Sequence, residues 1–138
     1  MTGFKVLWSA LLLLNTWRDI RRREIFAGIT VTAGIFAWAA RAFTENSAVS
    51  AAADLLPGGF LLCMGLLSRG KIGGGDGLMV CVGGLCLGLE EILAVVSLGF
   101  LFGVLAGLVV RRHGGKDGAI PFLPCLLAAY CVERIWWH

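Results

Sequence analysis

The chain has 138 residues, of which 58% are hydrophobic and only 15% are charged, and its formal net charge is +3. Soluble domains are typically about 45–50% apolar and about 25% charged, so this composition and the mean hydropathy of +0.84 exclude an ordinary soluble domain and indicate an integral membrane protein. The length leaves room for a single membrane-embedded domain over residues 1–138, and we expect an all-α, polytopic helix bundle.

Hydrophobic runs along the chain predict about six transmembrane helices. A helix needs about 20 apolar residues to cross the hydrocarbon core, and fewer where flanking side chains snorkel or the bilayer thins. Only Glu90-Glu91 separate the fourth run from the fifth. We interpret the first run as a membrane helix because no small-residue cleavage site follows it. The predicted spans are Phe4–Trp17, Ile25–Ala42, Val49–Leu67, Gly77–Leu89, Ile92–Val110 and Ala119–Trp137.

Basic residues are concentrated in three alternate loops between these helices. By the positive-inside rule, those loops face the cytoplasm and both termini lie outside. We expect the basic side chains to contact anionic lipid headgroups, and we expect no nucleic-acid partner. Asp54, Glu90 and Glu91 fall on the opposite side, where we expect helix caps and solvated turn charges. The three basic loops hold Arg18, Arg21, Arg22, Arg23, Arg69, Lys71, Arg111, Arg112 and Lys116.

Asp19 and Asp76 share the cytoplasmic face in this topology. Asp19 follows the end of the first predicted helix, and Asp76 begins the fourth. Each has an ordinary explanation, since Asp76 suits a helix N-cap and Asp19 suits an ion pair with Arg18 or Arg22. Two carboxylates brought together would instead share a proton, because like charges a few ångströms apart cannot both ionise. One would then activate water and the other would polarise a peptide carbonyl, and the sequence leaves open which does which.

Four glycines surround Asp76, namely Gly73, Gly74, Gly75 and Gly77. A plain helix cap does not require them, and they cost backbone entropy. Glycine is useful where another backbone approaches closely, so we interpret these residues as a loop that admits a substrate peptide to Asp76. A phosphate-binding loop is a poorer explanation, because the residue order lacks the GxxxxGK[ST] arrangement and the aspartate would repel phosphate.

Three motifs in chain order resemble those of the type IV prepilin peptidases, which are membrane aspartic peptidases with a GxGD motif. Gly73 to Asp76 match G-x-G-D. Asp19 to Ile25, "DIRRREI", are similar to the D-x-R-x-R-x-I stretch that follows the family's first helix. Ile120 to Pro124, "IPFLP", are similar to the I-P-F-x-P run that opens its last helix. One motif falls in each basic loop, and together they span the membrane domain.

The resemblance implies a peptidase of a prokaryotic cytoplasmic membrane that removes short basic leaders from prepilin-like or pseudopilin precursors. It implies cleavage after a glycine and before the substrate's hydrophobic helix, without a metal or organic cofactor. Asp19 and Asp76 fall on the positions of the family's catalytic pair. The family often has Pro-Asn where Phe26-Ala27 stand here. Larger members add a cysteine-bearing loop and methylate the new N-terminus, whereas the first loop here is short and has no CxxC, so we expect a peptidase-only member.

Two other functions fit parts of the sequence. A small carrier or channel subunit would use the paired acids as a proton or cation site, but it would place them near mid-membrane, and here the acids occur only at helix ends. A catalytically inactive assembly factor would bind pilin-like helices. Asp117, in a polar turn, is a competing carboxylate on the same face. The five cysteines lie in apolar segments without a CxxC pair, so we expect neither a disulfide framework nor a zinc site.

Overall fold

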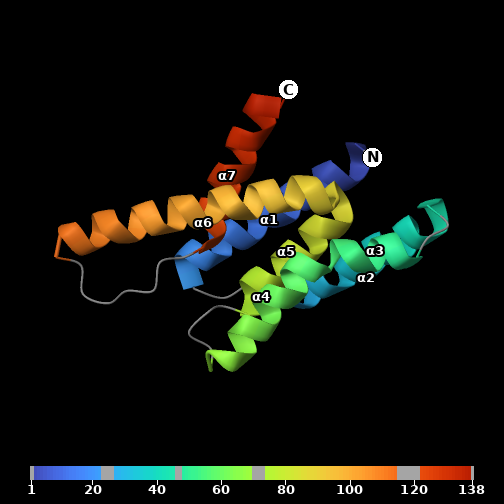
Figure 1. The fold of residues 1–138 in the computed structure, drawn as a ribbon, viewed down its shortest axis with the longest axis horizontal. Coiled ribbons are helices and arrows are strands. Elements are labelled where there is room, and N and C mark those ends of the chain that lie inside the picture. The colour runs from blue at the N-terminus through green and yellow to red at the C-terminus, as the bar shows by residue number, and fades with distance from the viewer. Residues whose placement is uncertain (1, 23–26, 46–47, 70–73, 115–121, 138) are drawn as a thin grey trace.

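The computed structural model describes residues 2–22, 27–45, 48–69, 74–114 and 122–137. Within these ranges every regular element is an α-helix, so the predicted all-α fold is confirmed. Figure 1 shows the helices arranged as a bundle. The elements are α1 (Thr2–Arg22), α2 (Ala27–Glu45), α3 (Ala48–Asp54), α4 (Leu56–Leu67), α5 (Gly74–Leu87), α6 (Leu89–Arg112) and α7 (Phe122–Trp137).

The third predicted span, Val49–Leu67, consists of two helices in the structure. α3 ends at Asp54, Leu55 forms a turn, and α4 begins at the next residue. Pro57 lies in the first turn of α4, where its missing N–H is tolerated. The same ring disfavours a continuous helix through the residues before it. The prediction of one unbroken helix was therefore wrong, and the proline explains the break.

The break between α5 and α6 lies at Gly88 and not at the two glutamates. Gly88 has a φ of 97° and a ψ of 165°, a backbone conformation that favours glycine. Glu90 and Glu91 fall in the first turn of α6, where the helix dipole stabilises negative charge. The predicted boundary between the fourth and fifth spans was therefore misplaced, because these acids begin a helix and do not interrupt one.

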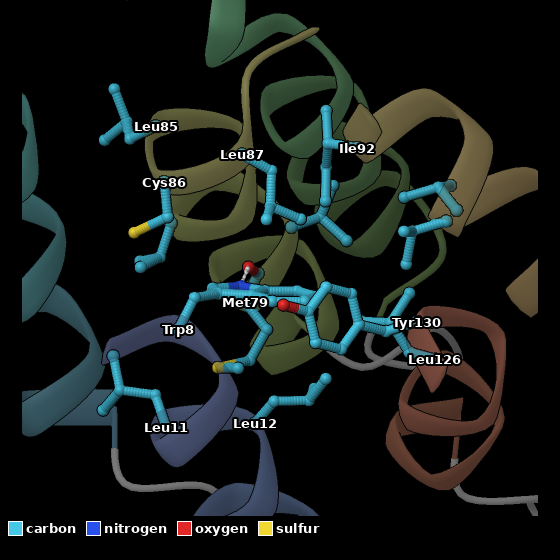
Figure 2. Packing of buried hydrophobic residues seen from close by; sticks show 14 of the residues in the cluster. Trp8, Leu11, Leu12, Met79, Leu85, Cys86, Leu87, Ile92, Leu126 and Tyr130 are labelled. Atoms are coloured by element: carbon cyan, nitrogen blue, oxygen red, sulfur yellow. Dashed lines mark hydrogen bonds between the residues drawn. The ribbon is translucent and has the colours of Figure 1, made fainter. Parts of the chain in front are cut away.

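α5 is the central helix of the bundle. It packs against α1, α2, α4 and α6, while α7 packs against α1 and α6 (Figure 1). Trp8 of α1 and Tyr130 of α7 form a T-shaped pair with ring centroids 4.8 Å apart (Figure 2). The Trp8 indole N–H also donates to the carbonyl of Met79 at 3.2 Å. This one buried tryptophan therefore joins three helices.

Glycines on α5 allow its neighbours to approach closely. A Cβ added to Gly84 would lie 1.9 Å from the carbonyl oxygen of Asp54, and one added to Gly83 would lie 2.9 Å from the ring of Trp8. Side chains at these two positions would therefore push α3 and α1 away from α5. Because Trp8 is near the start of α1 and Gly83 is in the second half of α5, the two helices run antiparallel.

Opposite charges pair at the end of the bundle where α6 begins. The Lys5 ammonium lies 2.6 Å from the Glu91 carboxylate. The Arg41 guanidinium lies 3.2 Å from the Asp54 carboxylate and donates to the carbonyl of Leu85 at 2.9 Å. Asp54 is buried, so the expectation of a solvated turn charge was wrong for this residue. Its burial is tolerated because Arg41 supplies the opposite charge.

The helices differ in how well each would cross a membrane. Among the described helices, α6 is the one that is both long and apolar enough to span a bilayer, and α4 and α5 are shorter apolar helices. One such helix is weak evidence for a membrane. Large apolar side chains are nevertheless exposed on several helices, including Phe43, Leu66, Ile135 and Trp136, and exposed apolar patches mark surfaces that meet a membrane or a partner. The six spans and the outward termini stay predictions.

Two neighbouring glycines of α4 provide a matched test of the α4–α5 contact. A Cβ on Gly58 would lie 2.3 Å from the backbone nitrogen of Cys81, whereas one on Gly59 would meet nothing within 4 Å. We expect Gly58→Ala to lower the free energy of unfolding by about 1–3 kcal/mol through overpacking, and Gly59→Ala to be neutral or to raise it by up to about 1 kcal/mol. Thermal unfolding in detergent measures both, and equal melting temperatures would contradict this packing.

Candidate active site

Asp19 lies on the core-facing side of α1. The helix continues through it to Arg22, so the prediction that Asp19 follows the helix end was wrong. Arg21 and Arg22 in the last turn favour the longer helix, because cations stabilise a helix C-terminus. Asn15 and Thr16, one turn before Asp19, are both buried. Since residues three and four apart share a helix face, Asp19 continues the stripe of α1 that faces the other helices.

Asp76 lies in the first turn of α5. Gly74, Gly75 and Gly77 belong to the same helix, so the interpretation of these three as a loop was wrong, and Gly73 lies outside the described residues. A Cβ on Gly77 would lie 2.9 Å from a backbone nitrogen of α4, whereas one on Gly74 would meet nothing within 4 Å. Gly77 is therefore needed for helix packing, and among the described residues no neighbour crowds Gly74.

A buried polar contact around Asn15 holds α1 and α5 in register. It lies one helical turn deeper in the bundle than the two aspartates. The Asn15 side-chain amide donates to the Thr30 hydroxyl of α2 at 3.1 Å and lies 3.3 Å from the sulfur of Met79. Asn15 precedes Asp19 by one helical turn, and Met79 follows Asp76 by one turn. Because α1 and α5 run antiparallel, this contact brings the turns that carry the two carboxyls together at one end of the bundle.

The charge of Asp19 acts on Asp76. Asp76 has its pKa raised from 3.8 to about 7, first by burial and second by the negative charge of Asp19. Asp76 precedes the predicted membrane span Gly77–Leu89, so this carboxyl belongs to the end of the helix. Both causes disfavour the ionised form of a carboxyl. Near neutral pH, the Asp76 carboxyl therefore gains and loses a proton readily while a second carboxyl lies close to it.

This arrangement suits acid–base chemistry. A carboxyl whose pKa is near neutral is able both to hold and to release a proton during a reaction. In the described ranges, no three His, Cys, Asp or Glu side chains come together as a metal-binding group, and all five cysteines are free. Asp117, the competing carboxylate, lies outside the described residues. The candidate site consists of Asp19 and Asp76 with the first turn of α5.

Comparison with known families agrees with the motifs. The family model of the type IV leader peptidases matches residues 6–108, a range that contains both Asp19 and Asp76. The chain belongs to the type IV leader peptidase family. The "IPFLP" motif lies beyond the matched range, and its last three residues open α7. Searches of curated proteins and of solved structures found no match.

The sequence pattern did not reveal the polar contacts that support this candidate site. Asn15, Thr30 and Met79 meet from three different helices, and nothing in their spacing predicts that meeting. Asn15 did carry one signal, because a buried amide in an apolar helix needs hydrogen-bond partners. Its position one turn before Asp19 marks the face of α1 that turns toward the core.

Removing the Asn15 amide tests the contact that sets the register. We expect Asn15→Leu to lower the free energy of unfolding by about 1–2 kcal/mol, because the Thr30 hydroxyl loses its donor and the Met79 sulfur loses one of its two polar contacts. The matched control is Thr32→Val, since the exposed Thr32 hydroxyl donates to the Gly28 carbonyl of its own helix. Unfolding in detergent compares the two variants. A melting temperature for Asn15→Leu equal to that of Thr32→Val would show that the contact does not hold the helices.

The protonation of Asp76 is measurable without a substrate. We expect an infrared band of a protonated carboxyl that disappears as the pH rises through about 7 and that is absent from Asp76→Asn. In Asp19→Asn, the midpoint should move to lower pH, because the repulsion is gone, but it should stay above 3.8, because burial remains. A midpoint that Asp19→Asn leaves unchanged would contradict the electrostatic coupling of the two carboxyls.

Proposed function

We propose that the protein is a membrane aspartic endopeptidase that removes the short basic leader from type IV prepilin-like precursors. Family membership supports the peptidase class and the kind of substrate. The observation that carries the catalytic assignment is the coupling of Asp19 and Asp76. These two carboxyls come from helices far apart in the sequence, and the charge of Asp19 adds to burial, the larger cause, in raising the pKa of Asp76.

The pair would hydrolyse the peptide bond with water as the nucleophile. The ionised carboxylate takes a proton from water, whose oxygen attacks the carbonyl carbon of the scissile bond. The protonated carboxyl donates to the carbonyl oxygen and stabilises the charge that develops there. The carbon–nitrogen bond of the resulting tetrahedral species then breaks as the leaving nitrogen takes a proton from the pair. The products are a leader with a new carboxylate and a mature protein with a new amino terminus.

The raised pKa of Asp76 favours Asp76 as the member that starts protonated. Burial keeps its proton up to about neutral pH, which leaves Asp19 as the base that activates water. Because the pKa of Asp76 is about 7, this division of roles describes the state that dominates just below neutral pH. Gly74 supports access for the substrate, since a Cβ at that position would meet no atom of the described residues within 4 Å.

The proposed location is the cytoplasmic membrane of a prokaryote, with several spans and the site on the cytoplasmic side. Arg21 and Arg22 at the end of α1, and Arg111 and Arg112 at the end of α6, are the kind of basic residues that face the cytoplasm. We propose that they contact anionic lipid headgroups, each contributing about 1 kcal/mol. The ion pairs formed by Lys5 and Arg41 would then lie on the outer side.

Methylation of the new amino terminus is not part of this proposal. The stretch between α1 and α2 covers only residues 23–26, and it contains no cysteine. The larger members that the chain resembles carry a cysteine-bearing loop for that activity. The mature product is therefore expected to have an unmodified amino terminus.

Substituting the two aspartates tests the proposed chemistry. Purified protein in liposomes is incubated with prepilin-like precursors from the same genome, and mass spectrometry identifies the cut. We expect wild type to cut after a leader glycine and to leave the new amino terminus without a methyl group. We expect Asp19→Asn and Asp76→Asn to reduce kcat by at least about 100-fold, because each removes one partner in proton transfer.

Two further variants serve as controls in the same assay. Glu90→Gln changes an exposed carboxylate in the first turn of α6, and Asp117→Asn changes the competing carboxylate. Both should retain the activity of wild type. Cutting by Asp76→Asn at the wild-type rate would refute the proposed dyad, and ion flux through the same liposomes would then test the carrier alternative.

A further inference from the structure

An apolar groove runs beside the Asp19 end of α1. It encloses about 450 Å³ and is bordered by α1 and by Leu127 of α7. Leu13 and Ile20 on its α1 wall are more than half exposed, and so is Trp17. The guanidinium carbon of Arg21 lies 5.4 Å from the centre of the Trp17 ring, so a cation stands on the same wall. The groove therefore offers a long hydrophobic surface that ends near the proposed catalytic pair.

One polar side chain on the groove wall has an unused hydrogen-bonding group. Thr16 lines the groove and is 5% exposed. Its buried hydroxyl has no hydrogen-bond partner among the described residues. Other helical hydroxyls behave differently, since those of Ser9, Thr44 and Ser97 each donate to the carbonyl four residues earlier. A buried polar atom without a partner is costly, and its retention calls for an explanation.

The position of Thr16 relative to Asp19 suggests what the hydroxyl serves. The two residues are three apart on α1, so they lie on one face with about 4.5 Å of rise along the helix axis between them. Threonine in a helix adopts two side-chain rotamers, which lets the hydroxyl turn toward a bound molecule. A group bonded to Thr16 would therefore lie on the side of α1 that carries Asp19, about one helical turn from it.

We propose that this groove binds the start of the substrate's hydrophobic helix and that the Thr16 hydroxyl bonds to the substrate backbone beside the scissile bond. This inference rests on the proposed function and extends it by assigning where the apolar part of the precursor binds. A scissile peptide must be extended to reach a catalytic pair, which frees carbonyl and N–H groups that have no water to bond in an apolar environment. The Thr16 hydroxyl satisfies one of them.

A lipid acyl chain is the other apolar molecule that would fit such a groove. An acyl chain has no hydrogen-bonding group, so it would leave the Thr16 hydroxyl unsatisfied in the bound state as well. A peptide removes that cost on binding. The buried hydroxyl and its place one turn from Asp19 therefore favour a substrate peptide over a lipid tail.

Binding is measured first in the inactive Asp76→Asn protein, so the result does not depend on catalysis. The probe is a precursor-type peptide with a basic leader ending in glycine followed by an apolar helix. We expect Thr16→Val, which removes the hydroxyl but keeps the shape, to weaken binding by roughly 3- to 10-fold, the effect of one hydrogen bond. Thr16→Ser keeps the hydroxyl and should bind within about twofold of the parent.

A groove-filling variant tests the surface itself. Leu13→Trp places a large ring in the groove, and Leu101→Trp places the same ring at an exposed position of α6 that does not line it. In otherwise wild-type protein, we expect Leu13→Trp to raise KM for the full precursor by about 10-fold while kcat changes little, the pattern of lost ground-state binding. Leu101→Trp should match wild type.

Stability distinguishes a binding role of Thr16 from a structural one. Because its hydroxyl has no partner in the described protein, Thr16→Val should melt at or above the wild-type temperature while binding the probe more weakly. A parallel loss of stability and binding would overturn the proposal, and so would equal probe binding by Thr16→Val and Thr16→Ser. An unchanged KM in Leu13→Trp would show that the substrate does not bind in the groove and would overturn the proposal in favour of a lipid acyl chain. Failure of the dyad would appear instead as cutting by Asp76→Asn.

Discussion

The contact between α1 and α5 determines the rest of the structure. Trp8 donates to the carbonyl of Met79, and the Asn15 amide lies against the Met79 side chain, so one residue of α5 is held at two heights along α1 (Figure 2 shows Trp8 against Met79). The contact fixes both the axial position and the rotation of the two helices. Asp19 and Asp76 inherit their proximity from it, because each lies one turn away along its own helix.

Helix α5 has glycines, which lack side chains, on the sides where other helices approach. Gly77 meets α4, Gly83 meets the Trp8 ring, and Gly84 meets the carbonyl of Asp54. Each glycine in a helix interior costs about 1 kcal/mol of helix propensity relative to alanine. Close packing of backbones compensates for that cost, since small residues let membrane helices approach within reach of van der Waals contact. The sequence suggested that the glycines around Asp76 admit the substrate. In the structure Gly77 serves helix packing, whereas Gly74 has no close neighbour among the described residues.

The sequence predicted the all-α fold and drew attention to Asp19 and Asp76, whose catalytic role stays a prediction, but it did not predict the tertiary contacts that position them. Apolar runs reveal helices because their periodicity is local. The end of α1 was placed too early, because its last turn is basic and not apolar. Cations at a helix C-terminus stabilise such a turn. Asp54 was taken for a solvated charge because its partner Arg41 comes from another helix. Thr30 and Met79 gave no signal at all, since their role exists only when three helices meet.

Charge is distributed in opposite ways at the two ends of the bundle. Where α6 begins, Lys5 pairs with Glu91 and Arg41 with Asp54, so opposite charges attract across helices. At the other end two carboxyls are held near one another, and Asp76 has its pKa raised from 3.8 to about 7. For a carboxyl with a raised folded-state pKa, the contribution to stability is fully present below about pH 3.8 and is lost as the pH rises through about 7. At neutral pH and above, the ionised Asp76 carboxyl therefore destabilises the folded state. The packing around α5 must compensate for that loss of folding free energy. A carboxyl whose pKa is raised by burial and by a second carboxyl has the electrostatic pattern expected of a catalytic site.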